Sequence, residues 1–472
     1  MRHTNGLRRR PVGVRALQRH INRFAREDDG MMVFLVMFLL LIMLVVGGMG
    51  VDFMRQEMTR AQIQSTLDRA ILAAADMDQE LDPKSVVEDY FKKSGMENFL
   101  TKVEVDEGAS YRIVTASAST EMSTQFLGKI GFKTLTVPAF GRAEESLGNA
   151  EISLVLDISN SMNEGSKIQD MRKAAKDFVD TVLLDETLGA VSLSVIPYTS
   201  QVNAGPEILN RLNVHRMHSY SDCIIFNDAD YNNTSILPTT EYRQMPHFEL
   251  YKSGSSSNIT NPSCPNRNFE QIQPFSQNKQ DVKNKVGSAV GRANTAINIG
   301  MKWGVGLVDP AFRPVVTDMI NNGLVSADFK GRPTDYDAGS LKTVVLMTDG
   351  VNVDTYNVTD KAYATPSMRY HWSRNALITW LQEHSDSSLY NDFFYTVNSG
   401  SKKDSLLHNI CEAAKNKGIL VWTVGFEVND HGASVMQDCA SSPSHFFRVD
   451  GVEIAEAFRS IARQLNRLKL VQ

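Results

Sequence analysis

At 472 residues the chain is longer than one ordinary domain, so two or three structural units are expected. Its 42% hydrophobic and 22% charged residues are typical of a folded protein and argue against global disorder. The net charge of −5 is unevenly distributed. Residues 1–30 hold eight Arg and three acidic residues, a charge of +5, whereas the rest of the chain carries −10. An acidic body without a basic stripe argues against nucleic acid as a partner.

The first predicted element is a membrane-spanning helix. Residues Met31–Val51 contain no charged residue, and a helix of that length spans about 30 Å, the thickness of a bilayer core. A cleaved signal peptide is the main alternative, but the nearest cluster of small residues is Ala73–Ala75, more than twenty residues beyond the run and across a charged helix. We expect an uncleaved anchor, with the Arg-rich segment 1–30 in the cytoplasm and residues 52–472 across the membrane.

The helix is expected to continue to about residue 76, because apolar residues keep a helical spacing. Pro83–Phe91 predicts a short helix with Asp82 as its N-cap. Composition then changes to that of strands, which are predicted at Lys102–Val105, Tyr111–Ser119 and Lys133–Val137. Gly141–Asn149 is predicted to be a hinge.

From Glu151 onward strands and helices alternate, which predicts a mostly parallel, doubly wound α/β sheet with helices on both faces. The predicted strands are Ile152–Leu156, Ala190–Ile196, Thr343–Met347 and Ile419–Gly425. The predicted helices are Ser166–Leu184, Asn294–Leu307, Ser405–Lys417 and Val452–Leu468. Two long polar insertions, at about 206–280 and 354–402, interrupt the pattern, and long loops of this kind are either functional or disordered.

These patterns divide the chain into five parts. They are an Arg-rich segment at 1–30, a transmembrane helix at 31–51, a projecting helix and short helix at 52–100, a small strand-rich region at 101–148, and an α/β domain at 149–472 that carries both insertions.

The four cysteines all lie on the predicted outer side of the membrane. An even number in an oxidising compartment suggests two disulfides, although four cysteines allow three connectivities. Chain order and domain context favour Cys223–Cys264 and Cys411–Cys439.

Five oxygen-bearing side chains predict a site for a divalent cation. Asp157, Ser159 and Ser161 follow the first strand of the α/β domain, Thr295 lies near the start of a helix, and Asp349 follows a later strand. Hard oxygen ligands suit Mg²⁺, with Mn²⁺ or Ca²⁺ as alternatives. Ligands in α/β sheets gather beyond the carboxyl ends of the strands, where both aspartates fall.

The residue types explain what such a site does. Neutral hydroxyls hold an ion without quenching its charge, two carboxylates retain it, and one position stays open for a carboxylate of a partner. The alternative is that each residue only caps a helix or closes a turn. The set resembles the metal-ion-dependent adhesion site of von Willebrand factor A domains, in which three loops share one divalent ion.

The N-terminal part also resembles a known family. Residues 30–76, with Asp-Gly-Met-Met before the span and Gly-Val-Asp-Phe after it, resemble the start of TadE/TadG-like proteins of the bacterial Flp/Tad (tight adherence) pilus machinery. The long TadG-like members carry a C-terminal von Willebrand factor A domain. One departure is that Met31–Leu35, which follows Gly30, lacks the Glu of processed pseudopilins. This difference favours a permanent membrane protein.

The leading hypothesis is a bitopic inner-membrane protein whose periplasmic A domain binds a protein of the pilus or secretion apparatus through the divalent ion. The family resemblance implies the role in pilus assembly; the metal site alone implies only adhesion. The alternatives are an envelope tether whose metal only stabilises the fold, and a surface adhesin. An enzyme is not expected, because no nucleophile motif, acid–base carboxylate pair or phosphate loop occurs, and no small-molecule substrate is predicted.

Overall fold

The computed structural model describes residues 29–76, 79, 81–108, 111–146, 148–184, 188–251 and 259–469. The Arg-rich segment is therefore outside the described residues, except for its last two positions. Two compact units are present. The first ends at Glu145, and the second runs from Ser146 and also includes the four residues 108–111.

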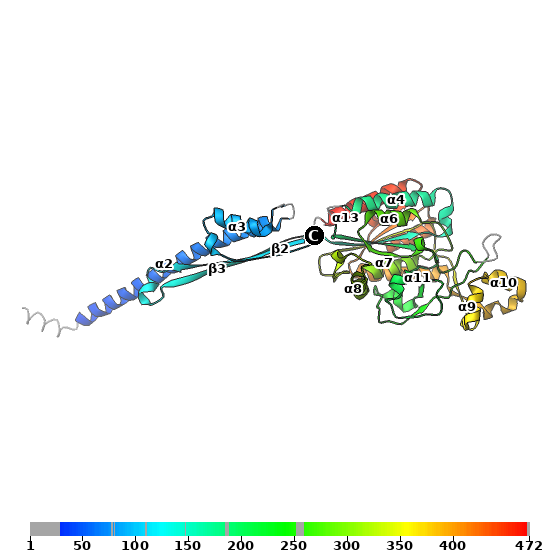
Figure 1. Ribbon diagram of the computed structural model, residues 1–472, viewed down its shortest axis with the longest axis horizontal. Coiled ribbons are helices and arrows are strands. Elements are labelled where there is room, and N and C mark those ends of the chain that lie inside the picture. The colour runs from blue at the N-terminus through cyan, green and yellow to red at the C-terminus, as the bar shows by residue number, and fades with distance from the viewer. Residues whose placement is uncertain are drawn as a thin grey trace, which may run out of the picture. The chain divides into compact units, whose positions relative to one another are not determined.

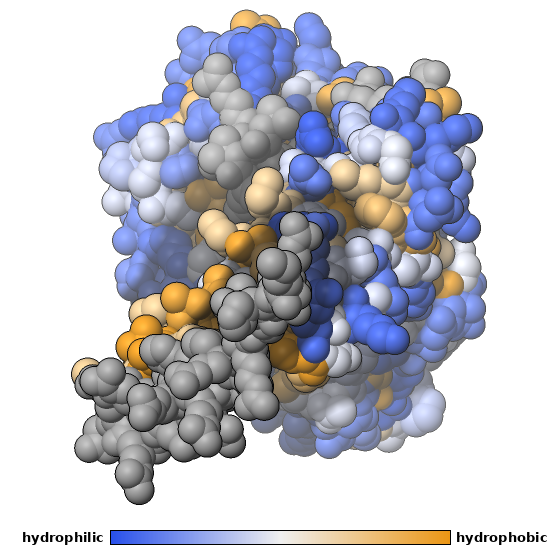
Figure 2. Space-filling model, turned by 90° about the vertical axis from the view of Figure 1, so that its left-hand side faces the viewer, coloured by the Kyte–Doolittle hydropathy of each residue, from blue (hydrophilic) through white to orange (hydrophobic). Residues whose placement is uncertain are grey.

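The first unit is built on one long helix, α2 (Asp29–Ala75), as the sequence predicts. The part of this helix from Met32 is long and apolar enough to cross a membrane, and only 6% of its most apolar window is buried. Figure 2 faces the end of the molecule that carries this part of α2, and hydrophobic side chains gather there. A short helix follows, α3 (Pro83–Lys93), and the predicted N-cap is confirmed because the Asp82 side chain accepts a hydrogen bond from the Ser85 N–H.

Three strands complete the first unit. They form a sheet in the order β1 (Leu100–Gly108), β2 (Tyr111–Ser123) and β3 (Thr134–Ser146). The second half of α2 packs on this sheet, since Ile63 and Leu67 share a buried core with Val114 and Val137. The strands are longer than predicted, and β3 covers most of the stretch Gly141–Asn149. The boundary between the two units, after Glu145, falls inside the predicted hinge Gly141–Asn149, but β3 keeps the backbone extended through Ser146, so the hinge is shorter than predicted.

The second unit is a doubly wound α/β domain. Its six-stranded sheet has the order β14-β13-β10-β4-β5-β9, and all neighbours are parallel except β5 and β9. The strands are β4 (Ala150–Asp157), β5 (Val191–Tyr198), β9 (Gln273–Ser276), β10 (Leu341–Thr348), β13 (Leu420–Phe426) and β14 (Phe446–Val449). The predicted fold class is confirmed, and the two edge strands β9 and β14 are additions that no long apolar run marks.

Helices cover both faces of this sheet (Figure 1). One face carries α4 (Lys167–Val182), α6 (Lys279–Gly287) and α13 (Glu453–Lys469). The other carries α7 (Ile297–Val308), α8 (Arg313–Asn321), α11 (Gly400–Asn416) and α12 (Asp430–Cys439). Alternate residues of β4 serve the two cores, with Leu154 on the first face and Val155 on the second.

Helix α7 is buried along its whole length, and glycine allows this close packing. A Cβ atom at Gly304 would lie 2.6 Å from Val155 Cγ2, so only glycine lets the helix approach the sheet so closely. The helix begins at Ile297 and not at Asn294 as predicted. Thr295 therefore lies in the loop before it.

The two predicted insertions fold together. Their elements are α5 (Gly205–Leu209), β6 (Val214–His215), β7 (Ile224–Ile225), β8 (Tyr242–Gln244), β11 (Thr355–Val358), α9 (Pro366–Trp372), α10 (Leu377–His384) and β12 (Phe394–Asn398). One buried core joins Phe248 of the first insertion to Trp372 and Leu381 of the second, around the disulfide Cys223–Cys264. The second disulfide, Cys411–Cys439, joins α11 to α12, so both predicted pairings are confirmed.

Candidate functional site

The carboxyl edge of the parallel sheet brings the predicted residues together. Strands β4 and β10 are neighbours, with Leu156 opposite Met347, so the loops after them meet at the same edge. Asp157 ends β4, and Asp349 follows β10 directly. The loop before the buried helix α7 supplies Thr295 to the same place.

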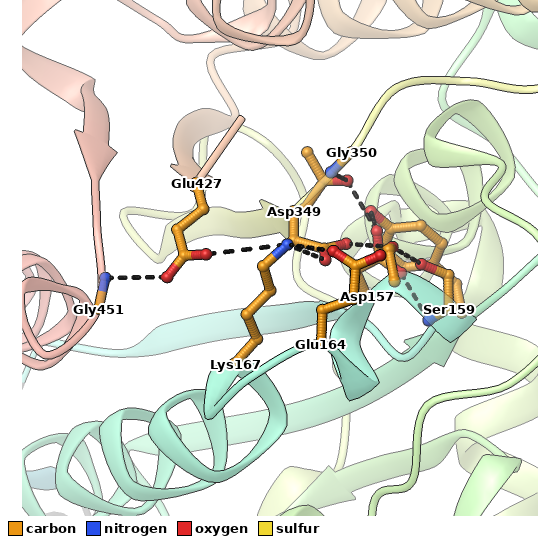
Figure 3. Close-up of polar contacts among 11 residues, drawn as sticks. Asp157, Ser159, Glu164, Lys167, Asp349, Gly350, Glu427 and Gly451 are labelled. Carbon is orange, nitrogen blue, oxygen red and sulfur yellow. Dashed lines mark hydrogen bonds and ion pairs between the residues drawn. The ribbon is translucent and has the colours of Figure 1, made fainter. Parts of the chain in front are cut away.

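Short hydrogen bonds connect the side chains of the first two loops. The Ser159 N–H donates to Asp157 Oδ1 at 2.7 Å, and the hydroxyls of Ser159 and Ser161 are 3.0 Å apart. Ser161 Oγ donates to Asp349 Oδ1 at 2.7 Å (Figure 3). These bonds hold four of the five predicted side chains in one cluster.

The third loop, which carries Thr295, meets the cluster beside Gly350 of the loop after β10. A Cβ atom at Gly350 would lie 3.9 Å from both Ser161 Oγ and Thr295 Oγ1, so the two hydroxyls flank the same point of the backbone. The structure therefore brings all five predicted residues together.

Burial makes the two carboxylates unusual. Asp157 is 0% exposed and Asp349 is 4% exposed. Burial, and then the neighbouring charge of Asp349, raise the pKa of Asp157 to about 7. Burial also raises the pKa of Asp349, although the Ser161 hydroxyl and the ammonium of Lys167 offset part of this rise. Two buried carboxylates that repel each other form a site whose ionised state a cation would stabilise.

Two residues that the sequence reasoning missed hold Asp157 in place. Thr348 Oγ1 donates to Asp157 Oδ2 at 2.7 Å, and the Tyr198 hydroxyl lies 3.4 Å from the same oxygen. Tyr198 also donates to the backbone oxygen of Met347 at 3.0 Å, which ties β5 to β10 beneath the site. Thr348 stands beside Asp349 in the sequence, and this position was the only available signal.

Asn352 is a third residue that the sequence did not indicate. Its Oδ1 atom accepts from the Ile297 N–H at 2.7 Å, and its Nδ2 atom donates to Asp404 Oδ1 at 2.8 Å. The Val353 N–H donates to the Thr295 carbonyl at 3.3 Å. The loop after β10 thus holds the loop that carries Thr295.

A lysine at the start of α4 reaches the same carboxylates, and this residue was also missed. Lys167 Nζ lies 3.2 Å from Asp349 Oδ2, 3.5 Å from Glu164 Oε2 and 3.8 Å from Glu427 Oε2 (Figure 3). Burial lowers the pKa of Lys167, but attraction to Asp349 and the two glutamates outweighs burial, and its pKa is raised overall. The ammonium therefore compensates part of the negative charge of the site.

The donor set fits a hard divalent cation. It consists of two carboxylates and three hydroxyls, all of them oxygen ligands of the kind that Mg²⁺ and Ca²⁺ prefer. Across the described ranges, no group of three or more His, Cys, Asp and Glu side chains could hold a metal ion.

Comparison with a family model identifies the N-terminal segment. Residues 30–77 match the family described as "Putative Flp pilus-assembly TadE/G-like". The matched residues cover the apolar run and the second half of α2. No curated protein sequence matches the chain.

Among solved structures, similarity centres on von Willebrand factor domains. The vWF domain of the type V pili tip protein Mfa5 from Porphyromonas gingivalis is 13% identical, with a TM-score of 0.35, 68% of this chain covered and 97% of that one. The pilus adhesin SpaC from Lactobacillus rhamnosus GG is 13% identical, with a TM-score of 0.35, and 78% of this chain matches 33% of SpaC.

A third similar structure is proximal thread matrix protein 1 from the mussel byssus, with a zinc-occupied MIDAS motif. It is 13% identical, with a TM-score of 0.28, and 69% of this chain matches 46% of that protein. At such scores the von Willebrand factor A-type fold rests on the strand order of the protein itself.

Proposed function

From a chain whose N-terminal segment is TadE/G-like and whose second unit is a von Willebrand factor A-type domain, we propose a membrane-anchored protein that binds a protein partner of the pilus or secretion apparatus. A divalent ion, Mg²⁺ first, is held by Asp157, Ser159, Ser161, Thr295 and Asp349. A carboxylate of the partner completes its ligands. The observation that carries this proposal is the convergence of five oxygen side chains from three loops at the carboxyl edge of the sheet.

The ion supplies a concentrated positive charge that can bridge two proteins. Residues of this chain hold the ligands in position. Thr348 and Tyr198 orient the Oδ2 atom of the Asp157 carboxylate, and Asn352 fixes the loop that carries Thr295. Such preorganisation favours binding, because fewer groups lose freedom when a partner arrives.

The proposed location is the bacterial inner membrane, with the N-terminus in the cytoplasm and residues 52–472 in the periplasm. Two disulfides support an oxidising compartment for the second unit. The uncharged run Met31–Val51 supports a single span.

An envelope tether is the second candidate. Lys167 already places a positive charge 3.2 Å from Asp349, so part of the site's charge is compensated without a metal. In that case the ion would stabilise the domain and no partner carboxylate would be needed. A surface adhesin differs from both in that the second unit would be reachable from outside intact cells.

The test is a pull-down from detergent-solubilised membranes with the full-length tagged chain as bait. It is run in Mg²⁺, in EDTA, and with Asp157→Ala, and Asp180→Ala serves as control because Asp180 is a surface carboxylate on α4 paired with Lys283. Pilus or secretion components retained only by the Mg²⁺ wild type and the control support the metal bridge. The same partners in every lane would leave the tether.

A further inference from the structure

The turn between strands β2 and β3 carries exposed hydrophobic side chains that the core of its unit does not use. We call residues 124–133 the tip loop; it includes a short 3₁₀ turn, Leu127–Ile130. Leu127 is buried, but Phe126 is 45% exposed, Ile130 49% and Phe132 63%. Hairpin turns at a solvent surface are normally polar, so three such side chains in ten residues indicate a contact surface.

The carboxylate of Asp52 fixes the tip loop to helix α2. Its two oxygens accept hydrogen bonds from the backbone N–H groups of Gln125, Phe126 and Leu127, at 2.9, 2.8 and 2.8 Å. Asp52 is 0% exposed, so the loop covers the carboxylate completely. The position of the loop along the helix is therefore specified by an ionic group and not by loose apolar packing.

A glycine lets the loop extend past Asp52 toward the apolar run. A Cβ atom at Gly48 would lie 2.5 Å from the ring of Phe126, so this ring rests directly on the helix backbone. Gly48 precedes Asp52 by one helical turn, about 6 Å along the axis. Phe126 thus lies beside residues that belong to the uncharged stretch Met31–Val51.

Contacts along α2 show that the rest of the hairpin leads away from that stretch. Gln56 Nε2 donates to the Thr136 carbonyl at 3.1 Å, and Gln64 Nε2 donates to the Phe140 carbonyl at 3.0 Å. Strand β3 therefore runs along the charged half of the helix, and the tip loop lies where the apolar half ends.

We propose that the tip loop is a second membrane anchor that inserts into the interface of the bilayer spanned by α2. Phe126, Ile130 and Phe132 enter the boundary between headgroups and acyl chains, while the exposed Lys129 and Lys133 contact lipid phosphates. The loop contains no acidic residue, so no carboxylate of the loop would be repelled by the lipid phosphates. This inference rests on the proposed membrane anchoring and is independent of the metal site.

A bilayer is the occupant favoured by position. The exposed side chains lie at the level where the uncharged run meets the first charged residue, and the exposed apolar surface of the loop continues that of the helix. A second copy of the chain would have to cover the loop at the same level, inside the headgroup region.

The experiment uses the full-length chain in nanodiscs of mixed neutral and anionic phospholipid, one copy per disc. All four native cysteines are in disulfides, so a cysteine at Phe132 can be labelled with a fluorophore and exposed to lipids that carry a nitroxide near the headgroup. Phe140→Cys is the matched control, because Phe140 is 65% exposed on strand β3, which follows the tip loop, but lies beside Gln64. Leu40→Cys, inside the apolar run, reports whether the span itself is in the bilayer, and for this position the lipids carry the nitroxide deep in the acyl chain.

We expect the label at position 132 to be quenched at least threefold more than the label at position 140. Equal quenching at 132 and 140, with a quenched label at 40, would overturn the tip-loop anchor and leave the span intact. An unquenched label at 40 would overturn the span as well. Asp52→Asn, compared with Asp68→Asn on the exposed part of α2, should reduce quenching at 132 toward the level at 140; unchanged quenching would refute the role of Asp52.

Discussion

Replacement of Lys167 by methionine should tighten binding of Mg²⁺ to the cluster. Methionine keeps the length of the apolar stem and removes the ammonium that lies 3.2 Å from Asp349 Oδ2. In the native chain an incoming cation meets a positive charge already placed on one of its two carboxylate ligands. The variant removes this competition.

The structure sets the size of the effect. At 3.2 Å and an effective dielectric constant of about 20, the ion pair has a Coulomb energy of about 5 kcal/mol, which is a ceiling. The net contribution of a hydrogen bond between charged groups is about 1.5–3 kcal/mol. When a metal binds, Lys167 can turn to Glu164 or Glu427 and recover part of this energy. Competition by Lys167 therefore costs Mg²⁺ binding about 1–2 kcal/mol, and its removal should raise the affinity about 5- to 30-fold.

Isothermal titration of the detergent-solubilised full-length chain with Mg²⁺ measures this change. Lys283→Met is the matched control, because Lys283 on α6 pairs at 2.6 Å with Asp180, which lies at the opposite end of α4 from Lys167. The control should bind Mg²⁺ as the wild type does. Unchanged binding by Lys167→Met would refute competition, and weaker binding would show instead that Lys167 orients Asp349 for the ion.

Four further outcomes are expected. Because the pKa of Asp157 is raised to about 7, protons compete with the metal, and Mg²⁺ affinity should rise about tenfold between pH 6 and pH 8, measured by titration calorimetry; a flat profile would contradict a shared proton and metal site. The raised pKa also makes stability depend on pH: the stability that Asp157 contributes below its unfolded pKa of 3.8 is lost as pH rises through about 7. The metal-free domain should therefore melt at a lower temperature at pH 8 than at pH 5. Added Mg²⁺ should narrow this difference in melting temperature. Thr348→Val removes the 2.7 Å hydrogen bond to Asp157, so the midpoint of the affinity profile should move to higher pH. Gly304→Ala should destabilise the second unit by about 1–3 kcal/mol in urea unfolding, since its Cβ atom would lie 2.6 Å from Val155.

Apolar runs and the residues at their ends predicted the central strands and the places of the two aspartates, and the reason is geometric. Parallel strands place their carboxyl ends at one edge, so residues that directly follow two buried strands must meet there if the strands are neighbours. Strands β4 and β10 are neighbours, and Asp157 meets Asp349 through Ser161. Periodicity could not predict that pairing; it only marked where each strand ends.

The missed residues share a different physical cause. The site is completed by residues from a helix start, a neighbouring strand and a loop, namely Lys167, Tyr198 and Asn352. A local sequence pattern cannot predict these contacts, because each joins segments that are far apart in the chain. The insertions were read as two polar loops, yet their sparse aromatic residues form one common core that exists only when the segments meet. The hinge predicted at Gly141–Asn149 is shorter than expected for a similar reason, since pairing in the sheet extends β3 through Ser146 despite the local composition.

Asp52 and Asp157 carry the same sequence signal, an aspartate at the end of an apolar run, and their surroundings separate their roles. The Asp52 carboxylate accepts three backbone N–H groups, lies 3.8 Å from the guanidinium of Arg55, and has no second carboxylate in contact, so its charge is satisfied inside its own unit. Asp157 is equally buried but faces Asp349, whose like charge raises its pKa further. A buried carboxylate that donors and a cation already satisfy holds structure together, whereas a repelling pair requires an external cation to ionise fully. For this reason Asp52 suits the attachment of a loop, whereas Asp157 suits the exchangeable metal of the proposed function.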